Sequence, residues 1–430
     1  MSVALEGVLG AVTAPVRGVL EACLEGRTLG WADAVTLWGA RGRDLQALTM
    51  VADCLREQQA GDRVGYVVNR NINFTNVCVK SCKFCAFSRT RRSQEGYYLE
   101  VEEVVERVLQ AREFGATEVC VQAGLPPDPP RDIYLRLLRA IKDAAPEIHV
   151  HGFSPEEVKY GAELAGAPIA SYVRELKEAG LGSIPGTSAE ILDDAVRGRL
   201  AGGRISTAEW IEVISAAHRL GLPTTCTIMY GHVETDAERM KHLELLRSIQ
   251  LETAGFTEFV PLSFVHSEAP LHFKKMLPNV RSGPSGADVV RMIAISRLML
   301  GASLRNIQVS WVKEGLRQAQ QLLCSGGNDL GGTLMNESIS TSAGASHGQL
   351  MTPTVLREAI RDAGRSPFER STLYRSVRDF GPDPATDEVH PLDRIEDAEA
   401  SFGSYRVLVD RARSKREAGE RSLAIVGRPV

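Results

Sequence analysis

The strongest constraint on the fold is an alternation of short β-rich runs with longer helical patterns that begins at about residue 64. The first β-rich run covers 67–74, and the helical pattern at 101–114 that follows it carries valines on one face. Further β-rich runs are expected at 118–122, 148–151, 182–184, 224–229, 256–260, 307–310 and 322–324. The helices between them are expected at 133–144, 172–179, 207–220, 236–249 and 287–300. The alternation predicts an α/β fold.

Strands that alternate with helices are expected to pair in parallel, because a parallel connection needs a crossover helix. About eight strand–helix units predict a (β/α)8 barrel of the TIM type. A doubly wound open sheet is the alternative architecture. No glycine-rich dinucleotide-binding fingerprint follows the first β-rich run, which favours the barrel over the open sheet.

The barrel is expected to cover residues 64–350, with a helical segment at 1–63 before it and an extension at 351–430 after it. The extension begins with a helical pattern at 356–363. Its last part, 406–421, is heavily charged and predicts a solvated helix or a loose tail rather than a binding arm.

The composition is that of an ordinary globular protein, since 43% of the 430 residues are hydrophobic and 24% are charged. A net charge of -4 indicates no basic face and argues against a nucleic-acid partner. Arg17 interrupts the apolar stretch 8–20, which favours an amphipathic helix over a signal peptide or a membrane span. We therefore expect a cytoplasmic protein without a membrane partner, whose cysteines stay reduced.

Three cysteines, Cys78, Cys82 and Cys85, lie within eight residues, directly after the first β-rich run. Thiolates are the usual protein ligands of iron–sulfur clusters. Three protein ligands on a four-iron cluster leave one iron open for a substrate or cofactor, much as a catalytic zinc ion keeps an open position. Because barrel active sites lie at the C-terminal ends of the strands, we expect this cluster at the mouth of the barrel.

A structural zinc site is the alternative for these cysteines, and it would suit a metal-stabilised binding protein. Such a site normally needs four protein ligands, often as two Cys-x-x-Cys pairs. No second pair is present, and the other cysteines are isolated among apolar neighbours, as expected for small buried side chains: Cys23, Cys54, Cys120, Cys226 and Cys324. The spacing favours the cluster.

The Cys-x-x-x-Cys-x-x-Cys spacing after a first strand resembles the signature of radical S-adenosylmethionine enzymes. That resemblance implies a [4Fe-4S] cluster whose open iron binds S-adenosylmethionine, and an adenosyl radical that takes hydrogen from a substrate. The segments 71–78, 84–87 and 149–155 are similar to the deazaflavin- and menaquinone-pathway branch. The segments 327–335 and 342–345 most resemble the second subunit of deazaflavin (FO) synthase, the CofH-type family.

The resemblance to this family implies a reaction. L-Tyrosine is cleaved between Cα and Cβ, and its hydroxybenzyl fragment is joined to 5-amino-6-(D-ribitylamino)uracil in deazaflavin coenzyme biosynthesis. A glycine-derived imine is the other product. The implied partners are a reducing electron donor and a ring-closing enzyme that completes the deazaflavin.

The resemblance also carries over cofactor-binding residues by position. It places Gln122 and Gly124 beside the methionyl amine, and Ser188 and Glu190 near the ribose hydroxyls. The alternative role for Glu190 is a carboxylate at a helix N-terminus. Two further positions are assigned to the adenine: Phe84, for which packing under the cysteine loop is the alternative, and Gly231.

Three residues are candidates for contact with the reacting groups: His151, Asn328 and His232. His149 and His151 are expected to share one face of a strand, where a phenol or a pyrimidine would find hydrogen-bonding partners. A satisfied core histidine is the alternative for His151. For Asn328, the alternative is a glycine-rich turn with an Asx cap.

Two related enzymes compete with this interpretation: aminofutalosine synthase of menaquinone biosynthesis and the ring-closing deazaflavin enzyme. The segment 328–332 favours the branch that transfers the tyrosine fragment.

Overall fold

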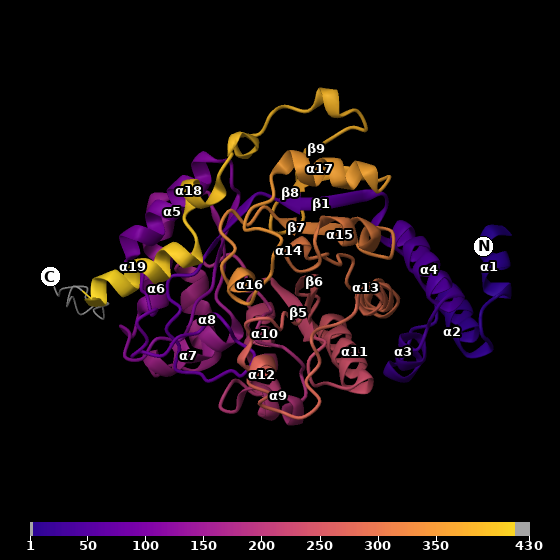
Figure 1. The fold of residues 1–430 in the computed structure, drawn as a ribbon, viewed down its shortest axis with the longest axis horizontal. Helices are drawn as coiled ribbons and strands as arrows, with labels where there is room; N and C mark the ends of the chain where they lie inside the picture. The colour runs from indigo at the N-terminus through magenta and orange to yellow at the C-terminus, as the bar shows by residue number, and fades with distance from the viewer. Residues whose placement is uncertain (1–2, 418–430) are drawn as a thin grey trace.

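The structure is a computed structural model that describes residues 3–417. A set of helices, coloured indigo in Figure 1, begins the chain and lies to one side of the strands. These helices are α1 (Val3–Gly10), α2 (Ala14–Leu24), α3 (Trp31–Trp38) and α4 (Arg43–Ala60). They all lie within the segment 1–63. None of the helices described is both long and apolar enough to cross a bilayer.

The strands follow in the order β1 (Arg63–Val67), β2 (Asn69–Ile72), β3 (Glu118–Val121), β4 (His149–Gly152), β5 (Thr224–Tyr230), β6 (Phe256–Ser263), β7 (Asp329–Gly332), β8 (Ser366–Arg370) and β9 (Ser376–Asp379). They form three sheets, with the strand orders β7-β1-β8-β9, β2-β3-β4 and β5-β6. Every pair is parallel except β8 with β9. The predicted parallel α/β fold is therefore confirmed.

Single parallel bridges connect the sheets. They are His151–Ser183 and Ile184–Thr224, between β4 and β5, and Phe259–Ile307 and Gln308–Asp329, between β6 and β7. The expected strands at 182–184 and 307–310 are therefore reduced to these bridges. One or two paired residues at each place leave too few ladder hydrogen bonds for a regular strand.

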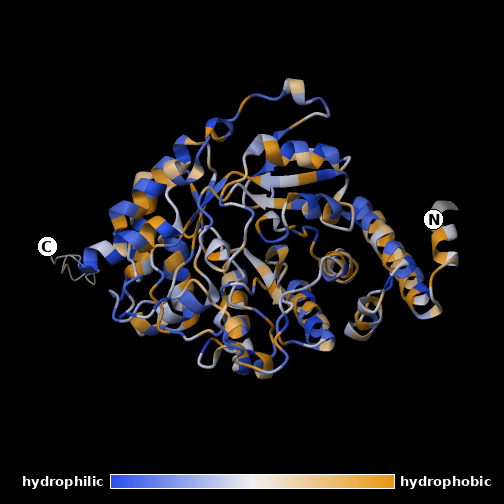
Figure 2. Ribbon diagram, viewed as in Figure 1, coloured by the Kyte–Doolittle hydropathy of each residue, from blue (hydrophilic) through white to orange (hydrophobic). Residues whose placement is uncertain are grey.

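The remaining helices are α5 (Val101–Glu113), α6 (Ile133–Ala144), α7 (Pro155–Ala165), α8 (Ile169–Glu178), α9 (Asp194–Ala201), α10 (Thr207–Arg219), α11 (Asp236–Thr253), α12 (Pro270–Phe273), α13 (Gly286–Leu300), α14 (Trp311–Glu314), α15 (Leu316–Leu323), α16 (Ile339–Ser342), α17 (Pro353–Asp362), α18 (Ala398–Phe402) and α19 (Tyr405–Glu417). They carry hydrophobic residues on some faces and hydrophilic residues on others (Figure 2). An amphipathic helix of this kind buries its apolar face against a sheet or a neighbouring helix.

Helices α7, α10, α11 and α13 begin with a serine or threonine followed three residues later by an acidic residue. In α7, the backbone N–H of Ser154 donates to the carboxylate of Glu157 at 2.8 Å, and the Glu157 N–H donates back to Ser154 Oγ at 3.3 Å. This capping box satisfies backbone donors that the helix leaves free, which fixes the point where each helix starts.

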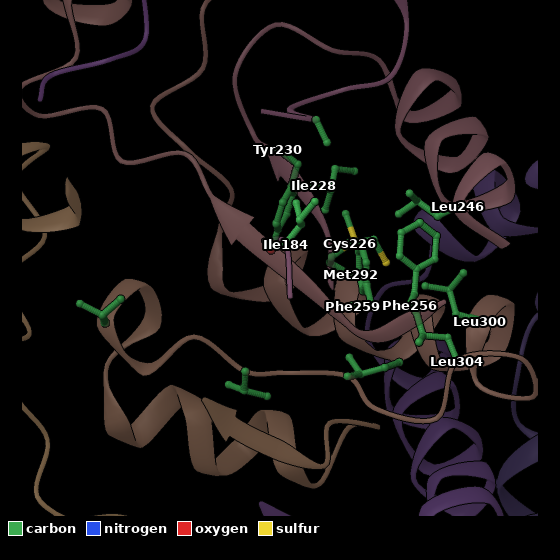
Figure 3. Packing of buried hydrophobic residues seen from close by; sticks show 14 of the residues in the cluster. Ile184, Cys226, Ile228, Tyr230, Leu246, Phe256, Phe259, Met292, Leu300 and Leu304 are labelled. Atoms are coloured by element: carbon green, nitrogen blue, oxygen red, sulfur yellow. The ribbon is translucent and has the colours of Figure 1, made fainter. Parts of the chain in front are cut away.

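The core between β5, β6, α11 and α13 is apolar (Figure 3). Cys226 in β5 and Phe259 in β6 are fully buried beside Leu246 of α11 and Met292 of α13. Burying a side chain of this size contributes roughly 1.5–3 kcal/mol. Cys226 therefore has the packing role that its apolar neighbours predicted.

Two expectations for the last strand are wrong. The run 322–324 was expected as a strand, but Leu322 and Leu323 end the amphipathic helix α15. The strand is β7, in a segment expected to be a glycine-rich turn. A Cβ on Gly332 would lie 2.1 Å from Asn69 Oδ1, so the glycine leaves room for the Asn69 side chain, which belongs to β2. Pairing with β1, rather than β propensity, holds β7.

The C-terminal extension returns to the body of the protein. Its strand β8 pairs in parallel with β1, from Arg63 opposite Ser366 to Tyr66 opposite Glu369. The last helix, α19, lies close to α5 (Figure 1), and Arg411 forms an ion pair with Glu103 at 2.5 Å. The helix expected at 356–363 is α17, which starts earlier, at Pro353.

Candidate functional site

Cys78, Cys82 and Cys85 line one cavity of about 260 Å³. They lie on the loop between β2 and α5, beyond the C-terminal end of β2. Backbone hydrogen bonds fix both ends of the cysteine segment: Cys78 N–H donates to Arg89 O at 2.9 Å, and Lys83 N–H donates to Leu200 O at 3.0 Å. The three cysteines of this one loop therefore line the same cavity.

The three thiols need a cation nearby to act as thiolates. Burial raises the pKa of Cys82 to about 12 and also raises the pKa of Cys78. Among the residues described, no three cysteine, histidine or acidic side chains converge tightly enough to hold a single metal ion. A four-iron cube differs in that each thiolate binds its own iron, so the sulfurs are spread around the cube. Three thiols that line one cavity are the donor type that iron–sulfur clusters use.

The segment Gln122–Gly124, at the end of β3, forms the neighbouring wall of this cavity. Glu157 holds this segment in place, because Oε1 of Glu157 accepts from the Ala123 N–H at 3.0 Å. Its other oxygen, Oε2, accepts from the Ser154 N–H at the start of α7. A Cβ on Gly124 would lie 2.4 Å from the carbonyl oxygen of Val77. Glycine at 124 thus allows the cysteine loop to lie directly against β3.

Arg204 organises the opposite wall. It contacts Glu156 at 3.1 Å and Glu190 at 2.6 Å, and its guanidinium carbon lies 5.6 Å from the centre of the Phe84 ring. Phe84, Ser188 and Glu190, which were assigned to the cofactor by resemblance, all line the cavity. The alternative for Glu190 is not observed, because α9 begins only at Asp194 and the carboxylate pairs with Arg204 instead.

The loop that carries Ser188 and Glu190 has an uncommon backbone. Both residues have positive φ angles, 62° and 45°. Arg197 supports the loop by donating to the carbonyl oxygen of Ser188 at 3.0 Å and to that of Ala189. His242 supports it from α11, since its Nδ1 accepts from the Leu192 N–H at 3.0 Å. Left-handed backbone at non-glycine residues is strained, so these contacts hold the loop in place.

A second cavity of about 200 Å³ lies among the strands. His151 lines it, and its Nδ1 lies 2.7 Å from Ser183 Oγ. The same hydroxyl lies 2.7 Å from Nε2 of His149, so the two histidines share a partner, as expected for one face of a strand. Burial lowers the pKa of His151 to about 4, which keeps its imidazole neutral at physiological pH.

The two cavities share a boundary. Five residues line both of them: Gln122, Thr187, Thr227, Leu262 and Lys313. A molecule in the inner cavity would therefore be separated from one in the cysteine-lined cavity by no more than these shared side chains.

Comparisons with known proteins agree with this site. A family model described as the radical SAM superfamily matches residues 72–246, and one described as the CofH/MqnC C-terminal region matches 253–381. The 5-amino-6-(D-ribitylamino)uracil–L-tyrosine 4-hydroxyphenyl transferase of Methanothermobacter thermautotrophicus is 50% identical over 81% of this chain and 94% of its own. The enzyme of the same name from Methanopyrus kandleri is 52% identical, over 74% and 85%. The chain belongs to this radical SAM transferase family.

Solved structures with low sequence identity support the same fold for the transferase. The FeFe-hydrogenase maturase HydG of Carboxydothermus hydrogenoformans matches with a TM-score of 0.65 at 16% identity, over 86% of this chain and 83% of that one. Methylornithine synthase matches with a TM-score of 0.60 at 18% identity, over 81% and 97%.

Three residues singled out from the sequence line neither cavity of the transferase. Asn328 Oδ1 accepts from Arg297 at 2.7 Å and from the Ile307 N–H at 2.8 Å. Both ring nitrogens of the buried His232 are engaged locally, with Nε2 2.9 Å from Met229 O and Nδ1 accepting from the Val233 N–H at 2.7 Å. Gly231 has a φ of 90°, and a Cβ there would lie 2.5 Å from Pro284.

Sequence reasoning missed three residues that the structure brings to the transferase site: Glu157, Arg204 and Lys313. Glu157 carried a signal, because Ser154 and Glu157 form the spacing of a capping box. Lys313 lies a few residues after the bridged segment 307–308. A sequence-based prediction could therefore have placed it beyond the end of a strand, where barrel active sites lie. Arg204 lies between two helices in a segment with no distinguishing pattern.

Proposed function

We infer that this chain transfers the 4-hydroxybenzyl group of L-tyrosine to 5-amino-6-(D-ribitylamino)uracil. The observation that carries this conclusion is identity of about 50% to transferases of that name over most of their length. The two adjacent cavities agree with it, because a reaction between two organic substrates needs room beside the cofactor.

We propose that Cys78, Cys82 and Cys85 hold a [4Fe-4S] cluster and that the cavity they line receives S-adenosylmethionine. The three-thiol donor set and membership of the radical SAM superfamily support this assignment. When bound, the cluster supplies the electron that cleaves S-adenosylmethionine to methionine and a 5′-deoxyadenosyl radical. An external reductant is needed as the source of that electron.

The chain's own residues orient the cofactor. Carbonyl groups of the Gln122–Gly124 segment suit the methionyl ammonium as acceptors. Ser188 and Glu190 present a hydroxyl and a carboxylate to ribose hydroxyls, while Arg204 fixes the direction of Glu190. Phe84 offers a ring face to the adenine.

The inner cavity is the proposed place for the reacting substrates. Its polar lining, which includes Glu118, His151 and Asn71, provides donors and acceptors for a phenol, a pyrimidine and a ribityl chain. His151 is neutral and bonded to Ser183, so it can donate or accept one hydrogen bond without adding a charge.

We also propose that the three sheets close into a (β/α)8 barrel, the architecture predicted from the alternation. Support comes from the single bridges that link β4 to β5 and β6 to β7, and from the pairing of β1 with β7. A closed arrangement places the carboxyl ends of all the strands around one mouth, where the cysteine loop lies.

A separate ring-closing enzyme is proposed to use the coupled product. The FO synthase of Nocardia farcinica is 48% identical over 79% of this chain, but the match spans only 39% of that protein. The rest of that longer protein therefore lies outside the match. Adding a ring-closing deazaflavin synthase to the coupled product should generate the deazaflavin chromophore.

The test is turnover under anaerobic conditions. Cluster-loaded protein is mixed with a strong reductant, S-adenosylmethionine, tyrosine labelled with 13C at Cβ, and the ribitylaminouracil. We expect a uracil adduct that retains the label, detected by mass spectrometry. Cleavage of S-adenosylmethionine without an adduct would overturn the assignment, and turnover of a menaquinone precursor instead would indicate aminofutalosine synthase. Protein that takes up zinc and no iron would indicate a metal-stabilised binding protein.

A further inference from the structure

Lys313 lies at the boundary between the two cavities and lines both of them. It belongs to the short helix α14, which neighbouring strands hold firmly. The buried Trp311 donates from Nε1 to Gly332 O of β7 at 2.9 Å, and Glu314 accepts from the Ser263 hydroxyl of β6 at 2.5 Å. The residues on either side of Lys313 are thus fixed, which positions its ammonium group.

Four cationic side chains line the two cavities: Lys80, Arg204, Lys313 and Arg370. Lys80 and Arg204 both contact Glu156, at 3.2 and 3.1 Å, and Arg370 contacts Asp329 at 2.5 Å. Within residues 3–417, Lys313 alone among the four has no carboxylate within 4.0 Å. Lys313 is thus a half-buried cation in the cavity lining, with no counter-ion among the residues described.

The acidic residues whose charge acts on Lys313 are Glu337, Glu314 and Glu190, and none of them forms an ion pair with it among the residues described. Both carboxylate oxygens of Glu337 already have other hydrogen-bond partners. One accepts from the Asn71 side chain, and the other accepts from the Ser340 N–H at 2.6 Å. Burial consequently lowers the pKa of Lys313. An ammonium that loses part of its hydration without gaining a partner is unfavourable, and a carboxylate ligand in the cavity would supply that partner.

We propose that the Lys313 ammonium binds the α-carboxylate of the amino-acid substrate where the two cavities meet. This inference rests on the proposed function, which makes that substrate L-tyrosine. A carboxylate held at the boundary leaves the amine and Cα beside the cysteine-lined cavity and directs the aromatic ring into the inner cavity. Lys313 thereby selects an α-amino acid over an amine that lacks the carboxylate.

The test compares tyrosine with tyramine, which has the same phenol and amine but no carboxylate. Binding of each is measured by anaerobic calorimetry to cluster-loaded protein saturated with S-adenosylmethionine. A hydrogen bond between two charged groups predicts that the wild type binds tyrosine about 10- to 100-fold more tightly than tyramine. Lys313→Met should reduce this ratio to within about threefold. Lys313→Arg, which keeps the charge, should retain most of it.

Lys274→Met, at an exposed lysine after α12, is the matched control and should keep the wild-type ratio. The proposal is overturned if Lys313→Met keeps that ratio, or if it weakens tyrosine and tyramine equally. It is also overturned if the variant loses affinity for S-adenosylmethionine by the same factor, because the lysine would then serve the cofactor's carboxylate. Iron content and melting temperature confirm that each variant is folded.

Failure of the proposed function gives a different result. In that case the wild type forms no coupled uracil product from tyrosine. If it still prefers amino acids over their decarboxylated amines, and Lys313→Met removes that preference, the role of Lys313 stands and only the identity of the substrate changes.

Discussion

Arg370 in β8 holds both carboxylate oxygens of Asp329 at the start of β7, with Nε 2.5 Å from Oδ2 and Nη2 2.9 Å from Oδ1. Both residues are buried, and Arg370 lies 3.5 Å from Glu258 as well. Two acidic residues share one cation, so the negative charge is incompletely balanced, and burial raises the pKa of Glu258 and that of Asp329. The C-terminal extension therefore closes a charged network inside the fold.

Replacing Arg370 with methionine should destabilise the protein strongly. The substitution leaves two buried carboxyl groups without their cation, which costs about 3–5 kcal/mol in free energy of unfolding. Anaerobic urea denaturation measures the effect. Arg375→Met, at an exposed arginine a few residues away, should change stability by less than about 0.5 kcal/mol. Equal stability of the two variants would show that the network is not structural.

Replacing Gly124 with alanine should disturb the cysteine loop. The new Cβ would meet the backbone of Val77, one residue before the first cysteine, and neither side can move freely. Overpacking of this kind costs roughly 1–3 kcal/mol, and we expect lower iron content after anaerobic reconstitution.

Gly198→Ala is the control for that substitution. Gly198 lies in α9 with no atom within 4 Å of its would-be Cβ. Alanine in a helix interior is favoured over glycine by about 0.5–1 kcal/mol, so this variant should be slightly more stable and keep its iron. Normal iron content in Gly124→Ala would show that the close contact between Gly124 and the Val77 backbone is not needed to position the cysteine loop.

The sequence predicted those parts of the site that depend on local spacing. The cysteine loop needed only the separations between Cys78, Cys82 and Cys85, and helix α6 has the predicted bounds because its apolar residues repeat at helical spacing. The sequence could not show whether the side chains of Asn328 and His232 face the site. Whether such a side chain faces a cavity depends on distant partners, such as Arg297 for Asn328.

Lys313 was missed for a related reason. The absence of a counter-ion is a property of the folded protein, and the sequence around it, Trp311-Val312-Lys313-Glu314, suggests an ordinary neighbouring pair of charges. Strand β7 was missed because two of its four residues are glycines, which have poor strand propensity. Its pairing with β1 overrides that preference.

Acid should destabilise the protein partly through His242. Its Nδ1 accepts from Leu192 N–H and its Nε2 lies 2.9 Å from Thr227 O, so the ring is neutral, and burial lowers its pKa from 6.5 to about 3. The unfolded chain takes up this proton near pH 6.5 and the folded chain does not. The contribution of His242 to the free energy of unfolding is therefore fully present above pH 6.5. It falls by about 1.4 kcal/mol for each pH unit below 6.5, until about pH 3.

His242→Gln tests this dependence. The variant should be less stable than the wild type at pH 7.5, but the difference should shrink by about 2 kcal/mol on going to pH 5, because the variant lacks the titrating group. Urea denaturation at both pH values gives the comparison. His347→Gln, at an exposed histidine, should follow the wild type throughout. Parallel curves for His242→Gln and the wild type would contradict the assignment.

Cys82→Ala should abolish both cluster assembly and S-adenosylmethionine cleavage, because two thiolates do not hold a four-iron cluster against solvent. Iron analysis and visible absorbance of the anaerobic protein report the cluster, and methionine release reports cleavage. Cys324→Ala, at an exposed cysteine after α15, should retain both properties. Four irons and full turnover in Cys82→Ala would remove the basis for the cluster assignment.

The pairing of β1 with β7 and β8 has a consequence for biogenesis. The neighbours of β1 on both sides are encoded about 260 to 300 residues later in the chain. At translation rates of about 5–20 residues per second, the ribosome needs roughly 15–60 s to deliver them. Until then Val64 and Tyr66, buried in the finished protein, stay exposed on the nascent chain. This sheet therefore cannot form until both distant segments have been synthesised, and the early part of the chain must wait for them.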